Sequence, residues 1–162
     1  MTLCARSRSA ADTHALAGAL AELARPGDVI LLAGELGAGK TAFTQGFAAA
    51  LGVREHVTSP TFTLAAHYEG RLDLNHVDVY RLEHLDEVFD LGLPELLDEG
   101  GVTIIEWGDA IVGALPADYL LIRLSYGEDT DERLVELEPV GARWSARGRA
   151  MALALAPWLQ PC

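Results

Sequence analysis

The chain has 162 residues and a mass of 17.3 kDa, the size of one domain, and its composition of 50% hydrophobic and 22% charged residues is typical of a globular protein. Its formal net charge of −12 argues against broad, unaided binding to DNA or RNA, because contacts from Lys and Arg to phosphates dominate that affinity. No apolar run approaches the roughly 18 residues that a membrane span needs, and the N-terminus lacks the pattern of a signal peptide. We therefore expect a soluble, cytoplasmic protein.

The apolar periodicity and the turn residues predict the secondary structure in some detail. The first part of the chain predicts an edge strand at 3–9, a helix capped by Ser9 and Asp12 and ended by Pro26-Gly27, a buried strand at 29–33, a glycine-rich loop, and a helix with Phe43, Phe47 and Leu51 on one face. The middle predicts strands at 61–68 and 72–80 around a turn at 69–71, one or two short helices at 85–98, and a buried strand at 102–107. The last part predicts a hairpin of strands 119–124 and 133–138 and a helix with Trp144, Gly148, Met151 and Leu155 on one face. This alternation predicts an α/β fold with a mixed, mostly parallel central sheet plus antiparallel hairpins, in a single domain over residues 1–162.

The strongest chemical signal is the segment Gly34-Glu35-Leu36-Gly37-Ala38-Gly39-Lys40-Thr41, which matches the phosphate-binding pattern G-x-x-x-x-G-K-[ST] in full. Glycines let successive backbone N–H groups turn toward phosphate oxygens, and the positive end of the following helix points at the same anion. Lys40 would reach the β- and γ-phosphates, and the hydroxyl of Thr41 would bind Mg²⁺. The loop follows a predicted buried strand and opens a predicted amphipathic helix, which is the context that the pattern requires.

Lys40 is the only lysine among the 12 basic residues of the chain. A sequence that otherwise uses arginine keeps lysine where a compact ammonium is required. The same fact excludes small GTPases that read guanine with N-K-x-D, since no second lysine exists. From the motif alone, two classes remain: a small-molecule kinase, or an ATPase that acts on a protein partner.

Two acids stand where predicted core strands end. Asp78 lies within the strand 72–80 and Glu106 ends the apolar run 102–106, so both are candidates to hold Mg²⁺ or to orient water. Ser59 and Thr61 flank Pro60 ahead of a strand and have the character of a sensor for the γ-phosphate. Trp107 follows Glu106 and is expected near the nucleotide.

Together, the loop at 34–41, Ser59-Pro60-Thr61-Phe62, His76-Val77-Asp78-Val79-Tyr80-Arg81 and Glu106-Trp107 occur in an order that resembles the bacterial TsaE (YjeE) family. The resemblance covers residues 10–110 well and the C-terminal third in outline. It implies a three-layer fold of the P-loop NTPase type and slow, Mg²⁺-dependent hydrolysis of ATP. It also implies action on the partner proteins TsaB and TsaD, which install threonylcarbamoyladenosine next to the anticodon of ANN-decoding tRNAs; tRNA would be met only through that complex.

By match of motif, the resemblance carries the family's functional roles onto this chain. The catalytic residues would be Lys40, Asp78 and Glu106, the metal ligands Thr41, Asp78 and Glu106, and the nucleotide-binding residues Glu35, Leu36, Gly37, Ala38, Gly39, Lys40, Thr41, Ala42, Ser59, Thr61 and Trp107. Which of the two acids binds Mg²⁺ and which orients the attacking water stays open, as do a kinase and a nucleotide-dependent binding module as alternative functions.

Several other residues have two interpretations. The stretch from Glu69 to Asp109 contains 12 acids and two arginines, and is either a solvated face or a site for a metal or a basic partner. The basic cluster of Arg143, Arg147 and Arg149 is either a solvated face or a contact with nucleotide, tRNA or an acidic partner. Arg81 is a candidate arginine finger or a structural ion pair, and His76 is expected to be a packed core histidine. Cys4 and Cys162, at opposite ends of the chain, are predicted to be free thiols.

Overall fold

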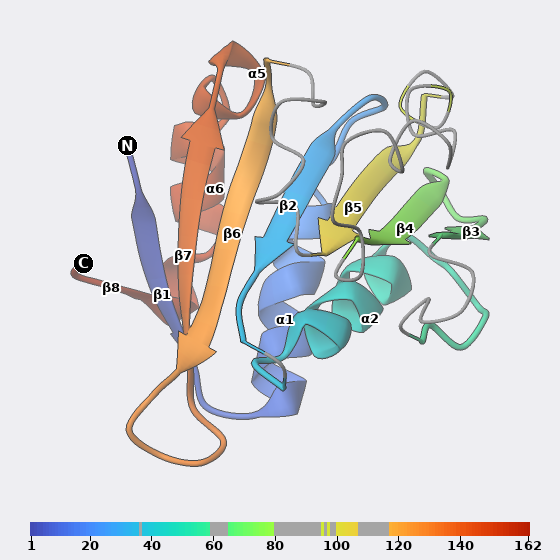
Figure 1. Cartoon of the computed structure of the whole chain (residues 1–162). Coiled ribbons are helices and arrows are strands. Elements are labelled where there is room, and N and C mark those ends of the chain that lie inside the picture. The colour runs from blue at the N-terminus through green and yellow to red at the C-terminus, as the bar shows by residue number, and fades with distance from the viewer. Residues whose placement is uncertain (36, 59–64, 80–94, 96, 98–99, 107–116) are drawn as a thin grey trace.

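A mixed sheet of eight strands, in the order β3-β4-β5-β2-β6-β7-β1-β8, organises the fold (Figure 1). The computed structural model describes residues 1–35, 37–58, 65–79, 95, 97, 100–106 and 117–162. In chain order its elements are β1 (Leu3–Ser7), α1 (Ala10–Ala21), β2 (Val29–Ala33), α2 (Lys40–Ala50), β3 (Ala65–Tyr68), β4 (Leu74–Asp78), β5 (Val102–Glu106), β6 (Tyr119–Tyr126), β7 (Arg133–Val140), α5 (Ala142–Ser145), α6 (Gly148–Ala154), the 3-10 helix η2 (Ala156–Trp158) and β8 (Leu159–Gln160).

Four neighbouring strands, β4, β5, β2 and β6, run parallel and form the centre of the sheet. The outer pairs β3–β4, β6–β7, β7–β1 and β1–β8 are antiparallel. The prediction of an α/β fold with a mixed sheet and antiparallel hairpins is confirmed. The strands β2, β4 and β5 are buried at every residue. This explains the continuous apolar run of β2, whereas β4 also buries the polar residues Asn75, His76 and Asp78.

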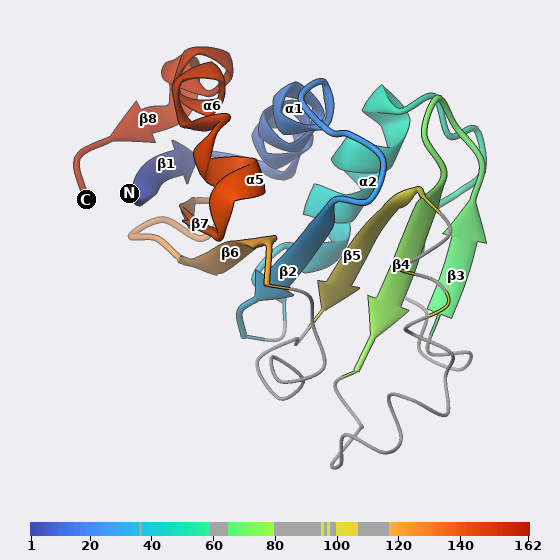
Figure 2. The same ribbon diagram turned by 90° about the horizontal axis from the view of Figure 1, so that it is seen from above.

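The described helices α1, α2 and α6 cover one face of the sheet (Figure 2). Their apolar residues pack on alternate strand positions such as Ile30, Leu32 and Ile104, while the other positions, including Leu31 and Ile105, form a second buried cluster on the opposite face. Of the helices predicted at 85–98, only Glu95 and Leu97 are described; both are helical, and Leu97 packs against that second cluster. Within the described ranges, no helix is long and apolar enough to cross a membrane.

The cap predicted for the first helix is confirmed. The hydroxyl of Ser9 accepts a hydrogen bond from the backbone N–H of Asp12 at 3.0 Å, which satisfies one of the free donors at the start of α1. The return contact differs from a standard capping box, because the Asp12 carboxylate accepts from the backbone N–H of Arg8 at 2.9 Å.

Two predictions about the chain ends are wrong. The strand β1 is not at the edge, since it pairs with β7 on one side and with the two-residue strand β8 on the other. That second pairing sets Cys4 opposite Gln160 and brings the C-terminus beside β1, where Cys4 and Cys162 form a disulfide. Distance along the chain had suggested two free thiols, but sheet pairing places their Cα atoms 5.3 Å apart.

The C-terminal helix is also divided, into α5 and α6, at Arg147. The guanidinium of Arg147 donates two hydrogen bonds of 2.7 Å to the buried carboxylate of Asp28 and lies 3.9 Å from the centre of the Trp144 ring. Arg147 is only 5% exposed, so neither interpretation of the basic cluster holds for it. Arg143 is half exposed and donates to the carbonyl of Pro26, and Arg149 is exposed. The pair Arg147–Asp28 therefore fastens the C-terminal helices to the residue that precedes β2.

Replacing Arg147 with Ala is expected to lower the free energy of unfolding by about 3 kcal/mol, because the buried carboxylate of Asp28 loses two side-chain hydrogen bonds of 2.7 Å and keeps the longer ion pair with Arg143 at 3.5 Å and the hydrogen bond from the backbone N–H of Arg25. Urea denaturation would measure this. The matched control is Arg149→Ala, on the exposed side of the same helix, which should change stability by less than about 0.5 kcal/mol. Equal effects of the two substitutions would show that the buried pair does not stabilise the fold.

Candidate functional site

The loop between β2 and α2 has the backbone shape of a phosphate-binding loop. Gly37 and Gly39 have φ values of +81° and +104°, in the left-handed region that favours glycine, and Gly39 is the N-cap of α2 without a side-chain cap. Gly34 has φ +152°, and a Cβ there would meet the carbonyl oxygen of Leu124 on β6. The loop can lie against β6 only with glycine at position 34. Leu36 lies outside the described residues.

Lys40, the first residue of α2, is buried against this loop. Its Nζ donates hydrogen bonds to the carbonyl oxygens of Gly34 at 2.7 Å and Glu35 at 2.9 Å. Burial lowers the pKa of the Lys40 ammonium below its ordinary value, and the carboxylates of Glu106 and Asp78 oppose that shift. The ammonium is thus held inside the loop, at the point where a phosphate chain would supply stronger acceptors.

The two predicted acids lie side by side at the carboxyl ends of β4 and β5. Asp78 is opposite Glu106 in the parallel register, and Glu106 is opposite Leu32 of β2, so both acids are next to the strand that enters the loop. They occupy the alternate positions that face α2, the same face as Leu74 and Ile104. Asp78 is 9% and Glu106 is 2% exposed. The sheet register therefore brings Lys40, Asp78 and Glu106 into one site.

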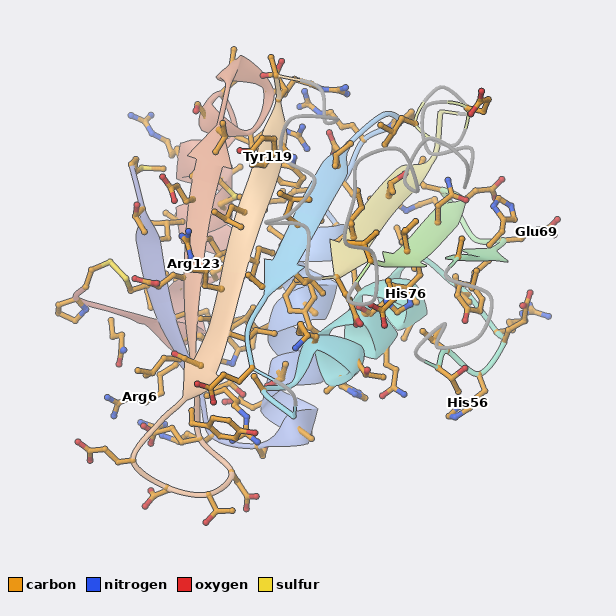
Figure 3. The ribbon with its side chains drawn as sticks, in the orientation of Figure 1. Arg6, His56, Glu69, His76, Tyr119 and Arg123 are labelled. Carbon is orange, nitrogen blue, oxygen red and sulfur yellow. A yellow bond between two sulfur atoms is a disulfide. The ribbon has the colours of Figure 1, made fainter. Side chains whose placement is uncertain are left out.

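His76 adds a contact that the sequence did not reveal. It is fully buried, as predicted for a packed histidine, but its Nε2 lies 3.2 Å from Oε1 of Glu106 (Figure 3). The geometry falls short of a hydrogen bond, so within the described part of the chain neither ring nitrogen of His76 nor Oε1 of Glu106 has a hydrogen-bond partner. The alternation of the strand puts His76 and Asp78 on one face; finding Glu106 as the neighbour requires the register of β4 against β5.

The oxygen atoms of this site fit Mg²⁺. The hydroxyl of the half-buried Thr41, the carboxylate of Asp78 and Oε1 of Glu106 are hard oxygen donors of the kind that Mg²⁺ prefers, and phosphate oxygens would complete its shell. In the part of the chain that the structure describes, no three His, Cys, Asp or Glu residues form a metal-binding group by themselves.

The remaining predicted residues divide into two groups. Glu35, Gly37, Ala38, Gly39, Thr41 and Ala42 all belong to the loop or to the first turn of α2. Ser59, Thr61, Arg81 and Trp107 lie outside the described residues. Sequence analysis gave no role to Arg133 of β7, whose guanidinium donates to the carbonyl oxygen of Gly37 at 3.4 Å.

Comparisons with known proteins find similar sequences and a similar structure. A family model described as "Threonylcarbamoyl adenosine biosynthesis protein TsaE" matches residues 7–135, well over half of the chain. Several proteins named tRNA threonylcarbamoyladenosine biosynthesis protein TsaE are similar to this chain. The one from Treponema pallidum is 48% identical over 73% of this chain and 87% of its own length, and the one from Bacillus subtilis is 47% identical over 82% and 83%. The crystal structure of Bacillus subtilis YdiB superimposes with a TM-score of 0.79 at 38% identity, covering 94% of this chain and 95% of that one.

Because Lys40 is the only lysine of the chain, its side chain can be observed by NMR without overlap from other lysines. In protein labelled with ¹³C-lysine, we expect one side-chain signal whose pKa lies below the ordinary 10.5 and rises when Mg²⁺ and inorganic triphosphate are added, because anionic oxygens favour the charged ammonium more than carbonyls do. With the folded pKa lowered, the unfolded chain binds more protons between that value and 10.5, so Lys40 makes stability rise with pH over that interval.

The same protein unfolded in urea supplies the reference pKa. A folded pKa at or above that reference, or a pKa unchanged by triphosphate, would contradict the burial of Lys40 or its role in binding phosphate.

Proposed function

The chain belongs to the TsaE family of threonylcarbamoyl adenosine biosynthesis proteins, and from this premise we propose that it is a Mg²⁺-dependent ATPase serving threonylcarbamoyladenosine modification of tRNA. The observation that carries the proposal is the meeting of Lys40, the glycine loop and the paired carboxylates of Asp78 and Glu106 at one edge of the sheet. The whole chain, residues 1–162, acts as one ATPase domain in the cytoplasm.

ATP binding begins with an exchange of partners at Lys40. The ammonium leaves the carbonyl oxygens of Gly34 and Glu35 and pairs with the β- and γ-phosphates. Backbone N–H groups between Gly37 and Ala42 donate hydrogen bonds to the phosphate oxygens. Moving a buried charge from neutral acceptors to anionic ones favours the bound state. Ser59 and Thr61 would sense the γ-phosphate in this proposal, and Trp107 would contact the nucleotide.

Hydrolysis follows from the two acids. Thr41 and one of Asp78 and Glu106 would hold Mg²⁺, which would supply positive charge to neutralise the phosphate oxygens. The other carboxylate orients the attacking water. His76 touches Oε1 of Glu106 and is a positioning residue, which limits the directions that this carboxylate can take. Charge on the γ-phosphate is further stabilised by Lys40.

A partner protein that supplies an arginine to the γ-phosphate would make turnover slow in the isolated chain and faster in the complex, and we propose TsaB and TsaD as these partners. The ATPase cycle would activate or reset that complex, and tRNA would be reached only through it.

Hydrolysis of ATP by the purified chain, alone and with TsaB and TsaD, tests the proposal. We expect slow turnover alone, acceleration by the two partners, and loss of both in Lys40→Ala, because no other lysine can replace the lost charge. A rate of ATP turnover that TsaB and TsaD do not change, together with transfer of phosphate to a small molecule, would contradict the proposal and favour a kinase.

The acids are tested by Asp78→Ala and Glu106→Ala. Each variant should still bind ATP while its turnover falls by about 100-fold or more, since each loses a group that acts on metal or water. Isothermal titration calorimetry and phosphate release measure the two effects. The matched control is Glu69→Ala, an exposed acid at the end of the β3–β4 hairpin (Figure 3), and it should behave like the native chain. Unchanged turnover in both acid variants would exclude this mechanism.

A further inference from the structure

The disulfide between Cys4 and Cys162 borders a cavity of about 270 Å³. Ala5 packs in the core beneath the helices, so its neighbour Cys4 points to the opposite face of the sheet. Figure 3 shows the bond in yellow beside β1. A small molecule can therefore reach the disulfide from the face opposite α1, α2 and α6. Besides the two cysteines, the cavity is lined by side chains of β6 and β7 and by the end of the chain, among them Ser125, Leu134, Glu136 and Pro161.

The two sulfur atoms differ in access. Cys162 is exposed, whereas Cys4 is 8% exposed and lies inside β1, which is paired on both sides. A thiolate exchanges with a disulfide by attacking a sulfur atom that it can reach, and the other sulfur leaves. Sγ of Cys162 is therefore the target of attack, and the buried Cys4 is the leaving group.

The last strand is too short to be held by sheet pairing alone. β8 contains only Leu159 and Gln160, both half-buried, and of the two Leu159 packs partly on the core. Strands of folded proteins usually have at least about three residues. The residue before β8 has its own anchor, because Nε1 of Trp158 donates to the carboxylate of Asp12 at 2.7 Å. Breaking the disulfide would thus release the chain from β8 onward and leave Trp158 in place.

The charge of the cavity selects among thiols. Glu136 of β7 is the only charged residue among those of the described chain that line the cavity. It is opposite Cys4 in the antiparallel register, where Cβ atoms are about 5 Å apart. Arg6 and Arg123, which lie nearby, each pair with another acid. An anionic thiol is therefore repelled at this position, whereas a neutral or cationic thiol is not.

We propose that the Cys4–Cys162 disulfide is a thiol-exchange site, which holds β8 on β1 when oxidised and releases it when a neutral or cationic dithiol enters the cavity. A thiolate of the dithiol first attacks Sγ of Cys162, so that a mixed disulfide forms and the electron pair of the broken bond leaves on Sγ of Cys4, which takes up a proton. The second thiol of the reagent then attacks its own sulfur atom in the mixed disulfide, and Cys162 leaves as a thiol. The protein disulfide has gained two electrons and two protons, and the dithiol has been oxidised to a disulfide.

The proposed location of the chain supplies both states of this site. Cytoplasmic reductants keep most thiols reduced, and disulfides that form there are mostly transient. The inference takes only this location from the proposed function, and its test needs neither ATP nor the glycine loop. Cys4 and Cys162 both lie outside residues 7–135, the segment that matches the TsaE family model, so the family's activity gives the bond no role.

Hydrogen exchange measured by mass spectrometry on the full chain tests the release of β8. The oxidised chain is compared before and after treatment with dithiothreitol, a neutral dithiol, and free thiols are counted by alkylation. We expect two thiols to appear under native conditions and the amides of β8 to exchange at least about tenfold faster, while those of α6 keep their rates. The control Cys162→Ser, which cannot form the bond, should exchange fast in β8 with and without the reagent.

Three results would overturn the inference. A bond that dithiothreitol opens only after denaturation would show that the cavity gives no access. An opened bond with unchanged exchange in β8 would show that the disulfide does not hold the strand. Two free thiols in the chain kept under oxidising conditions would show that the site does not close.

The charge of the cavity is tested by the first exchange step. The rate of mixed-disulfide formation with cysteamine, a cationic thiol, is divided by the rate with mercaptoethanesulfonate, an anionic thiol, each corrected for its thiolate fraction. Glu136→Gln should lower this ratio by about threefold, because one unit charge beside the sulfur atoms is lost. The matched control Glu69→Gln, at the turn between β3 and β4, should leave it unchanged. An equal ratio in Glu136→Gln and the native chain would contradict attack from this cavity.

Discussion

The arrangement of the candidate site depends on the burial of one ammonium group, that of Lys40. Lys40 is buried at the start of α2, and in this loop two backbone carbonyls receive its hydrogen bonds. Burial of a charge costs free energy unless strong partners are near. Near Lys40 lie the two carbonyl oxygens of the loop and, at the ends of β4 and β5, the carboxylates of Asp78 and Glu106. The loop is therefore suited to bind an anion. An anion would pair with the charge of Lys40 and would also accept hydrogen bonds from the backbone N–H groups at the start of α2, where the N-cap residue makes no side-chain hydrogen bond.

The parallel centre of the sheet provides this arrangement. Because β2, β5 and β4 run in the same direction, their carboxyl ends meet at one edge, and the register places Asp78, Glu106 and the entrance to the loop in a row. The antiparallel strand β7 returns on the far side of β2 and puts Arg133 against the loop. The acids proposed to act on phosphate and metal thus lie on one side of β2, and the contact of Arg133 with the loop lies on the other.

Local sequence predicts the parts of this design that depend on local physics. The strand Val29–Ala33, the loop glycines and the buried face of α2 follow from apolar runs and from the φ values that only glycine adopts easily. The cap at Ser9 follows in the same way. The two acids were identifiable as candidates because both stand at the ends of predicted core strands, although only the register shows that they are neighbours.

The features that sequence missed all join segments far apart in the chain. Arg147 and Asp28 are 119 residues apart, and Arg147, which was predicted to belong to a basic surface, is instead in a buried ion pair at the junction of α5 and α6. Cys4 and Cys162 meet only because β8 adds to β1. The contacts of His76 with Glu106 and of Arg133 with Gly37 likewise depend on which strands pair and in what register, and neither follows from spacing or composition.

The most direct test of the account is a crystal structure of the chain with Mg²⁺ and a non-hydrolysable ATP analogue. In that structure, Nζ of Lys40 is expected to leave the carbonyl oxygens of Gly34 and Glu35 and to contact the β- and γ-phosphates, with the metal between Thr41 and the Asp78–Glu106 pair. A nucleotide bound elsewhere, or a Lys40 that keeps both carbonyl contacts while the loop is occupied, would contradict it.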